Sequence, residues 1–454
     1  MSMISNALSG SIAAQAALGA ASQNIANLQT PGYTRQGVLL TSLSAGAGVR
    51  SAGNGVEVGA LMRFSDAYKS QQMWRAASDQ GLRSQAQPYL TQLERVMGDE
   101  KSSISNGIDG FFTALNAAAV DPTSTPLRQQ IITSADAMAQ HFNSINNVMS
   151  NQVLSLHQQR AAMMPQANTA LQNIAALNQR ISTSNAAGTN VSALIDARDQ
   201  LVDGLASQMA IEVNNQPDGS MNISLKSGQP LVIGNMSSTL TSSENAVGEQ
   251  SITLKFANST FKLDSIAIGG QIGGLGEFEQ NTLQPLQQSL RDLGKTLTDN
   301  INKQLNLGQT MAGAAGPDLF EYTDGVMSIK KDFTAADLAL ASAGGAAGDS
   351  KNLQSLIDIK NKPITVAWVG EVLISDADTQ LVGKLGIQSQ QNQALLKTAD
   401  TVRTQAVNDW NATSAVNKDE EAMNLVEFQN MYQANMKVIS VANTLFDATL
   451  AMMG

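Results

Sequence analysis

The sequence lacks cysteine and has few aromatic residues and few histidines. None of its 454 residues is cysteine, aromatic residues make up 4% of the chain, and histidine occurs twice. Without cysteine, the protein has neither disulfide bonds nor thiolate ligands for a metal ion. If it works outside the cell, packing and contacts with neighbouring molecules must hold it together. A chain of this length has room for two or three domains.

Clusters of basic residues and long apolar runs are also missing. The chain has 28 Lys and Arg against 38 Asp and Glu, a net charge of −10. This balance argues against nucleic acid as a partner, because binding to phosphates requires clustered basic side chains. The first 34 residues carry no charged side chain, yet no apolar run among them approaches about 18 residues. We therefore expect neither a membrane span nor a signal peptide with a basic start.

The clearest pattern in the chain lies in its C-terminal segment, residues 417–454. Side chains spaced by three and four residues form a first row, Leu425, Phe428, Tyr432, Asn435, Ile439, Ala442 and Phe446, and a second row beside it, Met431, Ala434, Val438, Val441 and Leu445. This spacing predicts a helix that needs a partner along one broad face. Asn417 is the expected N-cap, followed by an acidic first turn from Asp419 to Glu421. The polar Asn435 is expected to fix the register of the pairing at some cost in stability.

The other end of the chain offers that partner. The same spacing runs through Ile4, Ala7, Ser11, Ala14, Leu18, Ala21, Ile25 and Leu28 and ends at Thr30, Pro31, Gly32 and Tyr33. Proline stops a helix there, and Pro-Gly favours a tight turn. The N-terminal row is mostly Ala and Ser, so its burial contributes only a few kcal/mol at ~0.8 kcal/mol per methylene. We therefore expect paired coiled-coil helices that order fully when many copies pack together. The spacing alone fits a private hairpin equally well.

Between the ends, long helical patterns surround a β-rich segment. Helices are predicted over 65–97, 127–181, 191–209, 278–307 and 366–411, and strands over 211–213, 221–225, 231–233, 252–256 and 261–263. The expected fold class is mainly α with a β-rich insert (α+β), in a nested multidomain rod. Its parts are a terminal coiled-coil assembly domain (1–45 plus 405–454), a helical-bundle rod domain (46–208 plus 269–404) and a small β-rich outer domain (209–268). We expect the β domain to lie farthest from the ends in space.

The sequence shows no arrangement of residues typical of catalysis or metal binding. The tripeptide at 294–296, Gly-Lys-Thr, lacks the earlier glycine of a phosphate loop, since Ser289 stands there. His141 and His157 lack partners at ligand spacing, so we expect both to be solvated. The glycines within 269–276 do not fit a dinucleotide-binding loop, and we interpret them as a flexible joint. We therefore expect no enzyme activity, no cofactor and no metal.

Two groups of charged residues have simple explanations in the sequence. Asp196, Arg198, Asp199 and Asp203 form a charged face of one predicted helix, and helix capping accounts for Asp419, Glu420 and Glu421. Function is therefore expected to reside in surfaces. Our hypothesis is that Leu425, Phe428, Tyr432, Ile439 and Phe446 form a face shared with neighbouring copies rather than a private core.

The residues at the two ends resemble a known family. The segment 24–36 reads NIANLQTPGYTRQ, and residues 414–421 and 428–435 read SAVNKDEE and FQNMYQAN. Both are similar to the terminal signatures of the bacterial flagellar axial proteins, and the combination most resembles the hook-associated proteins of the hook–filament junction. The matching motif residues are Asn27, Thr30, Pro31, Gly32, Tyr33, Asn417, Asp419 and Glu420. The family usually has Gly where this chain has Ala415, and an apolar residue where it has Lys418, which bears on the local turn only.

This resemblance implies a structural adaptor that assembles on the distal end of the hook and forms the hook–filament junction. The implied partners are further copies in a helical ring or layer, the hook protein, the second junction protein, and an export chaperone on the C-terminal segment. The implied location is outside the cell, after export by the flagellar type III apparatus. Two roles stay open for Thr30 to Tyr33. They either serve only to end the helix, or they also contact the next subunit or the export gate.

Other functions stay open at the level of sequence. The second junction protein or a flagellin-like subunit is the nearest alternative. A type III secreted helical effector belongs to another class and has no reason to carry both terminal signatures. A wall hydrolase would require a pocket with paired carboxylates or a nucleophile.

Overall fold

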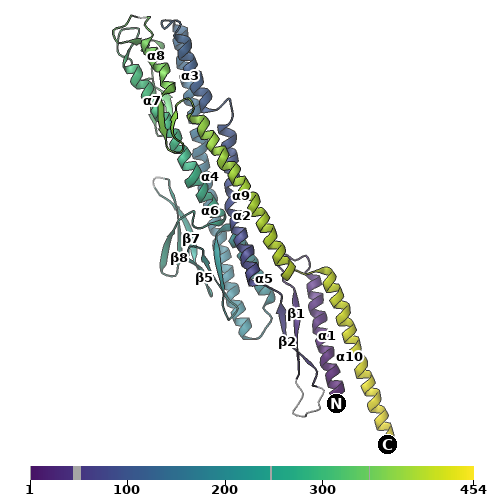
Figure 1. Ribbon diagram of the computed structural model, residues 1–454. Coiled ribbons are helices and arrows are strands. Elements are labelled where there is room, and N and C mark those ends of the chain that lie inside the picture. Colours follow the sequence, from purple (N-terminus) through teal and green to yellow (C-terminus); the bar gives the residue numbers. More distant parts are fainter. Residues whose placement is uncertain (1, 44–52, 246–247, 347, 454) are drawn as a thin grey trace.

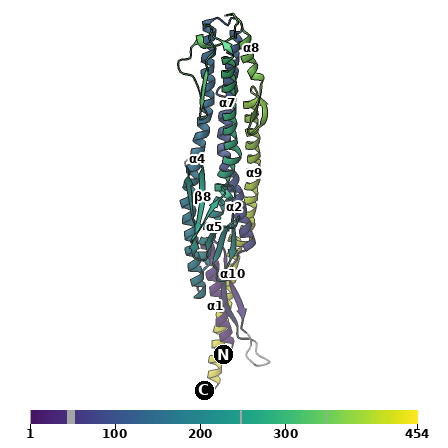
Figure 2. The same cartoon turned by 90° about the vertical axis from the view of Figure 1, so that its left-hand side faces the viewer.

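The computed structural model of the protein describes residues 2–43, 53–245, 248–346 and 348–453, and it is an elongated rod. Both ends of the chain lie at the same end of this rod in two perpendicular views (Figure 1, Figure 2). The fold is mainly α with β-rich segments, as predicted. None of the helices in the described ranges is long and apolar enough to cross a membrane.

The two ends of the chain form a slender unit of helices and one hairpin. Helix α1 (Ser2–Ala26) lies beside α10 (Lys418–Met453), as the two heptad patterns predicted. Strands β1 (Gln36–Ser42) and β2 (Val56–Arg63) pair antiparallel and pack against α1. We call α1, β1, β2 and α10 the terminal unit. The predicted domain boundary at 45/46 lies outside the described residues.

Long helices form the rest of the rod. They are α2 (Ala67–Met97), α3 (Ile104–Ala118), α4 (Thr125–Ala186), α5 (Ser192–Gln208), α7 (Gln284–Asn306) and α9 (Ala377–Ser414). Local chemistry explains where several of them begin. Asp66 caps α2 by accepting from the backbone N–H of Tyr68 at 2.9 Å, and Ser103 caps α3 by accepting from that of Asn106 at 3.2 Å.

The β-rich segment forms two small antiparallel sheets. The first contains β3 (Ile211–Asn215), β4 (Met221–Leu225), β5 (Pro230–Ile233) and β6 (Met236–Ser237), and the second β7 (Thr239–Glu244), β8 (Gln250–Phe256) and β9 (Ser259–Leu263). Their place differs from the predicted one, because both sheets lie along the side of α4 between the two ends of the rod (Figure 1). Asn178 of α4 donates to the Met221 carbonyl at 2.7 Å, and Asn168 donates to the Leu240 carbonyl at 2.8 Å.

The end of the rod far from the termini consists of helix ends and short hairpins. It includes α8 (Lys351–Ile357), the turns η2 (Ala335–Asp337) and η3 (Asp358–Asn361), and paired strands β10 (Gly308–Gln309) with β13 (Ala341–Ser342) and β11 (Phe320–Thr323) with β12 (Val326–Ile329). The helix predicted from residue 366 begins at Ala377 instead. The hairpin β14 (Pro363–Val366) and β15 (Gly370–Leu373) precedes it, because Gly370 adopts φ 90°, which favours a turn.

The glycines at 269–276 do not form a flexible joint. They begin α6 (Gly270–Phe278), which continues through the π-helical turn η1 (Glu279–Leu283) into α7. A Cβ on Gly274 would lie 2.2 Å from the backbone oxygen of Leu82, and one on Gly81 would lie 2.2 Å from that of Ser207. Glycine is needed here because the backbone of α2 packs close to the backbones of α6 and α5.

One continuous apolar core holds the rod together. It extends from Trp74 to Leu385 and includes residues of both small sheets, such as Ile223 and Leu254, together with α4 and α7. The β strands therefore share a core with the helices. The division into three domains stays a prediction.

Candidate functional site: the terminal unit

The first row of α10 faces α1, but it is only partly covered. Leu425, Phe428, Tyr432, Asn435 and Ile439 are half-buried, whereas Phe446 is 63% exposed. The exposure of Phe446 departs from the predicted continuous face because α1 is shorter than α10.

Asn435 lies against a glycine of the partner helix α1. A Cβ on Gly10 of α1 would lie 2.7 Å from the Asn435 side-chain oxygen, so the amide rests against a glycine. Its nitrogen donates to the Met431 carbonyl in its own helix at 2.9 Å. That close fit supports the predicted role of Asn435 in the register, which stays a prediction.

The row on α1 is buried mainly at its small residues. The buried positions are Ala7, Ser11, Ala13, Ala14, Ala17, Ala21 and Asn24. Leu18 is half-buried, while Ile4 and Ile25 are exposed. The burial covers two adjacent faces because the β1–β2 hairpin packs against α1 beside α10. The sequence pattern predicted the partner helix but did not predict the contact between α1 and the hairpin.

Many apolar side chains of the terminal unit are exposed. On α10 they are Met423, Val426, Met431, Met436, Val438, Val441, Leu445, Phe446 and Leu450, and on α1 they are Met3, Leu8 and Ile12; each is at least 38% exposed. Scattered exposed apolar residues are ordinary, but twelve of them on two paired helices are typical of an interaction surface. We call this set the exposed apolar face.

The segment after α1 is a hydrogen-bonded turn. Gly32 adopts φ 76°, a left-handed conformation that suits glycine. Thr30 donates from its backbone N–H to the Asn27 carbonyl at 2.9 Å and from its hydroxyl to the Asn27 side chain at 3.1 Å. The Tyr33 hydroxyl donates to the Asn24 side-chain oxygen at 2.9 Å. The motif residues therefore fix one conformation of the turn.

Asn24 also ties this turn to the hairpin. Its amide donates to the Gln36 carbonyl at 2.8 Å, and its oxygen accepts from the Gln36 backbone N–H at 2.9 Å. Asn24 is almost fully buried, and its spacing in the sequence alone does not predict this role. The only sign of this role in the sequence is a polar residue beside the mainly apolar row of α1.

The acidic turn of α10 contacts the N-terminal motif. Asn417 caps the helix as predicted, accepting from the Asp419 N–H at 3.0 Å. Capping does not explain the whole turn, however. Glu420 forms an ion pair with Arg35 at 2.8 Å, and Glu421 is buried. Burial, followed by the charges of Asp196 and Glu421, raises the pKa of Tyr33 to about 12.

The phosphate-loop-like tripeptide and the two histidines lie in packed or ion-paired positions of the rod. Lys295 pairs with Asp299 one turn along α7 at 2.7 Å, and Gly294 packs against Tyr322. His157 is buried rather than solvated, with ring nitrogens 2.6 Å from Glu244 and 2.7 Å from Glu279. His141 is half-buried. Across the described ranges, no three His, Cys, Asp or Glu side chains form a group that could hold a metal ion.

Two protein families match this chain, one over much of the rod and one over its C-terminal segment. Residues 90–320, just over half of the chain, match the family described as flagellar hook-associated protein FlgK helical domain. Residues 411–452, which include all of α10 except its last residue, match the flagellar basal body rod FlgEFG protein C-terminal family.

Relatives align over nearly the whole chain. Flagellar hook-associated protein 1 of Escherichia coli (strain K12) is 26% identical and that of Bacillus subtilis (strain 168) is 25% identical. These alignments cover 99% of this chain and 99% of the first relative, and 97% and 96% for the second. The fold is similar to the flagellar hook junction protein FlgK from Burkholderia pseudomallei, with a TM-score of 0.65 and 17% identity, over 75% of this chain and 99% of that one. The chain belongs to the flagellar hook-associated protein FlgK family.

Proposed function

We propose that this protein is a structural adaptor that assembles on the distal end of the flagellar hook and forms the hook–filament junction. The observation that carries the proposal is the exposed apolar face of a terminal unit whose motif residues are ordered by their own hydrogen bonds. Exposed apolar side chains are unfavourable in water and are stabilised when neighbouring subunits cover them. Family membership and the names of the relatives support the same role.

The partners follow from that role. We infer that copies pack side by side in a helical ring or layer through the exposed apolar face, against the hook protein on one side and the second junction protein on the other. Before assembly, α10 offers the same apolar side chains to an export chaperone. The location is the flagellum, outside the cell, after export by the flagellar type III apparatus. No enzymatic activity is expected in this structural family.

Substitutions in the row between α1 and α10 test the proposal. Phe428→Asp or Ile439→Asp introduces a carboxylate where the side chain is half-buried, so the terminal helices separate while the rod keeps its core. We expect loss of incorporation at the hook and loss of motility, with the helical signal of the rod retained. Gln433→Asp, at an exposed position of the same helix, is the matched control. Near-normal motility of Phe428→Asp would contradict the proposal.

A further inference from the structure

The terminal unit is attached to the rod without a shared apolar core. The continuous core of the described residues includes no residue of α1, β1, β2 or α10. Hydrogen bonds and ion pairs that cross this junction join Arg63 to Asp196 and Asp199, the Thr34 backbone N–H to Asp196, and the Arg35 backbone N–H to the Ser414 carbonyl. These polar contacts therefore contribute to the direction of the terminal unit where the continuous core does not.

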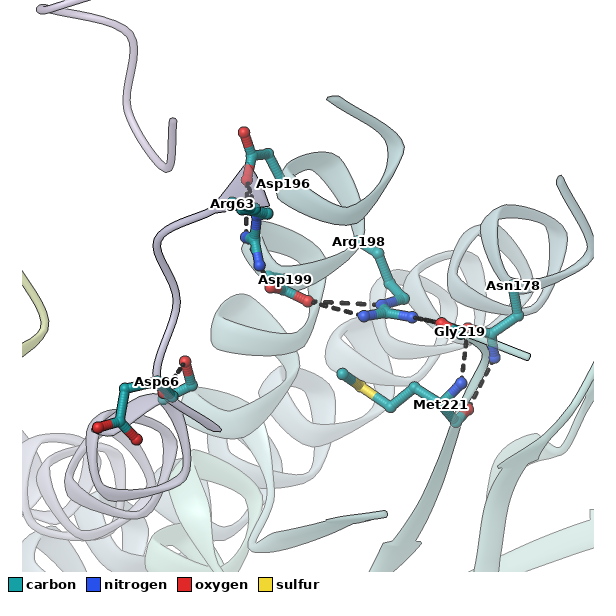
Figure 3. Close-up of polar contacts among 9 residues, drawn as sticks. Arg63, Asp66, Asn178, Asp196, Arg198, Asp199, Gly219 and Met221 are labelled. Atoms are coloured by element: carbon teal, nitrogen blue, oxygen red, sulfur yellow. Dashed lines mark hydrogen bonds and ion pairs between the residues drawn. The ribbon is translucent and has the colours of Figure 1, made fainter. Parts of the chain in front are cut away.

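Arg63, the last residue of β2, makes the closest of these contacts. Its guanidinium donates to Asp196 Oδ1 from Nε at 2.9 Å and from Nη2 at 2.7 Å, and to Asp199 Oδ2 from Nη2 at 3.0 Å (Figure 3). The three side chains are 14%, 11% and 20% exposed, so water screens the charges only in part. The pairing links the end of the hairpin to α5.

The same carboxylate also holds the beginning of the hairpin. Asp196 Oδ2 accepts from the backbone N–H of Thr34 at 3.2 Å, two residues before β1 begins. Residues Gln36 and Arg63 are opposite each other in the β1–β2 ladder. Asp196 therefore contacts the hairpin both where it begins and where it ends. Two contacts restrict rotation of the hairpin more than one contact would.

Asp199 is itself held from the other side. Arg198 donates to Asp199 Oδ1 at 3.2 Å from Nη2, and to the Gly219 carbonyl at 2.8 Å from Nη1 (Figure 3). Asn178 of α4 binds both backbone groups of Met221 nearby, at 2.7 and 3.1 Å. Burial lowers the pKa of Arg198, and the charge of Asp199 opposes that effect. Asp199 is thus tied through Arg198 to the turn that precedes β4.

We propose that Arg63 is a positioning residue that sets the direction of the terminal unit relative to the rod, with Asp196 and Asp199 as its fixed partners. The consequence for assembly rests on the proposed function, because subunits in a layer must present their apolar faces at one common angle. The structural part is a distance within one subunit, and it is measured on assembled subunits, in which the terminal helices are expected to order fully.

A distance measurement across the junction tests the structural part. Because the chain has no cysteine, Gln15→Cys on α1 and Gln393→Cys on α9 place two spin labels at exposed positions. Pulsed electron spin resonance on labelled full chains, diluted among unlabelled copies and assembled on isolated hooks, should give one narrow distance distribution. Arg63→Gln should broaden it while the helical signal stays unchanged. Arg83→Gln, which removes an ion pair with Glu277 inside the rod, should leave it narrow.

Charge exchange distinguishes positioning from general damage. Arg63→Asp and Asp196→Arg should each broaden the distribution, and the double variant should narrow it again, because the opposite charges face each other once more. A narrow distribution for Arg63→Gln, a broad one for the unsubstituted labelled chain, or a double variant no narrower than either single variant would overturn the inference.

The assembly consequence is measured separately in cells. Arg63→Gln should reduce incorporation at the hook and motility, and the charge exchange should restore part of the loss. Unchanged distances with normal incorporation would overturn the inference and leave the proposed function standing, because that function is tested by Phe428→Asp.

Discussion

Substitution of Gly274 by alanine should destabilise the rod, although alanine is the better helix former. A Cβ at this position of α6 would lie 2.2 Å from the backbone oxygen and 2.9 Å from the backbone carbon of Leu82. A backbone group cannot rotate away as a side chain does, so α2 and α6 must move apart. The apolar side chains that they bury together, including Ile272 and Leu275, would lose contact.

The expected magnitude is the difference between two opposing terms. Overpacking of a core costs about 1–3 kcal/mol, and contact with backbone places Gly274→Ala near the upper value. Replacing glycine by alanine inside a helix returns about 1 kcal/mol. The net loss in the free energy of unfolding is therefore about 2 kcal/mol, and Gly274→Val should lose more.

Urea unfolding followed by circular dichroism measures this loss, and a second glycine serves as the control. Gly383 lies on α9 with nothing within 4 Å of the Cβ it would carry. Gly383→Ala should therefore stabilise the protein by about 1 kcal/mol. Equal stabilisation by Gly274→Ala and Gly383→Ala would refute the close packing of α2 on α6 and restore the interpretation of these glycines as a flexible joint.

Two further predictions concern buried polar groups. Glu279→Leu leaves Arg160, which is 1% exposed, without its carboxylate, and should lower the free energy of unfolding by about 3–5 kcal/mol in a urea titration. Glu277→Leu removes a more exposed ion pair and should lower it by less than about 1 kcal/mol in the same titration. Equal losses would contradict the difference in burial. Tyr33 has its pKa raised from 10.0 to about 12, so the folded terminal unit retains this proton while the unfolded chain loses it, and stability should fall as pH rises from about 10 to about 12. Absorbance of tyrosinate should show a phenol titrating near pH 12 that Tyr33→Phe removes, and an unchanged titration curve would contradict the burial of Tyr33.

Spacing in the sequence was sufficient to predict the paired ends and the order of the elements. The rows on α1 and α10 have a period that only a helix satisfies, and the capping by Asn417 depends on neighbours in the chain. The strands β4 and β8 follow from alternation of apolar and polar residues in the same way. Each of these signals is local, which is why one sequence reveals it.

Contacts between distant segments were beyond that reach. Nothing near Arg63 in the sequence indicates that its partner lies 133 residues away on α5. His157 lies 122 residues from Glu279, so a buried cluster looked like a solvated histidine. The glycines at 269–276 look like a flexible joint in the sequence because the close approach of a second helix depends on the tertiary structure. The place of the β sheets beside α4 likewise depends on the core that they share with the helices.

Deletion of the gene, with the medium and the cell surface assayed together, tests the central claim most directly. A structural adaptor between hook and filament predicts that hooks remain, filaments are absent, and unpolymerised flagellin accumulates outside the cell. Restoration by the intact gene but not by the Phe428→Asp variant would tie the defect to the terminal unit. Attached filaments of normal length on the deleted strain would contradict the adaptor role.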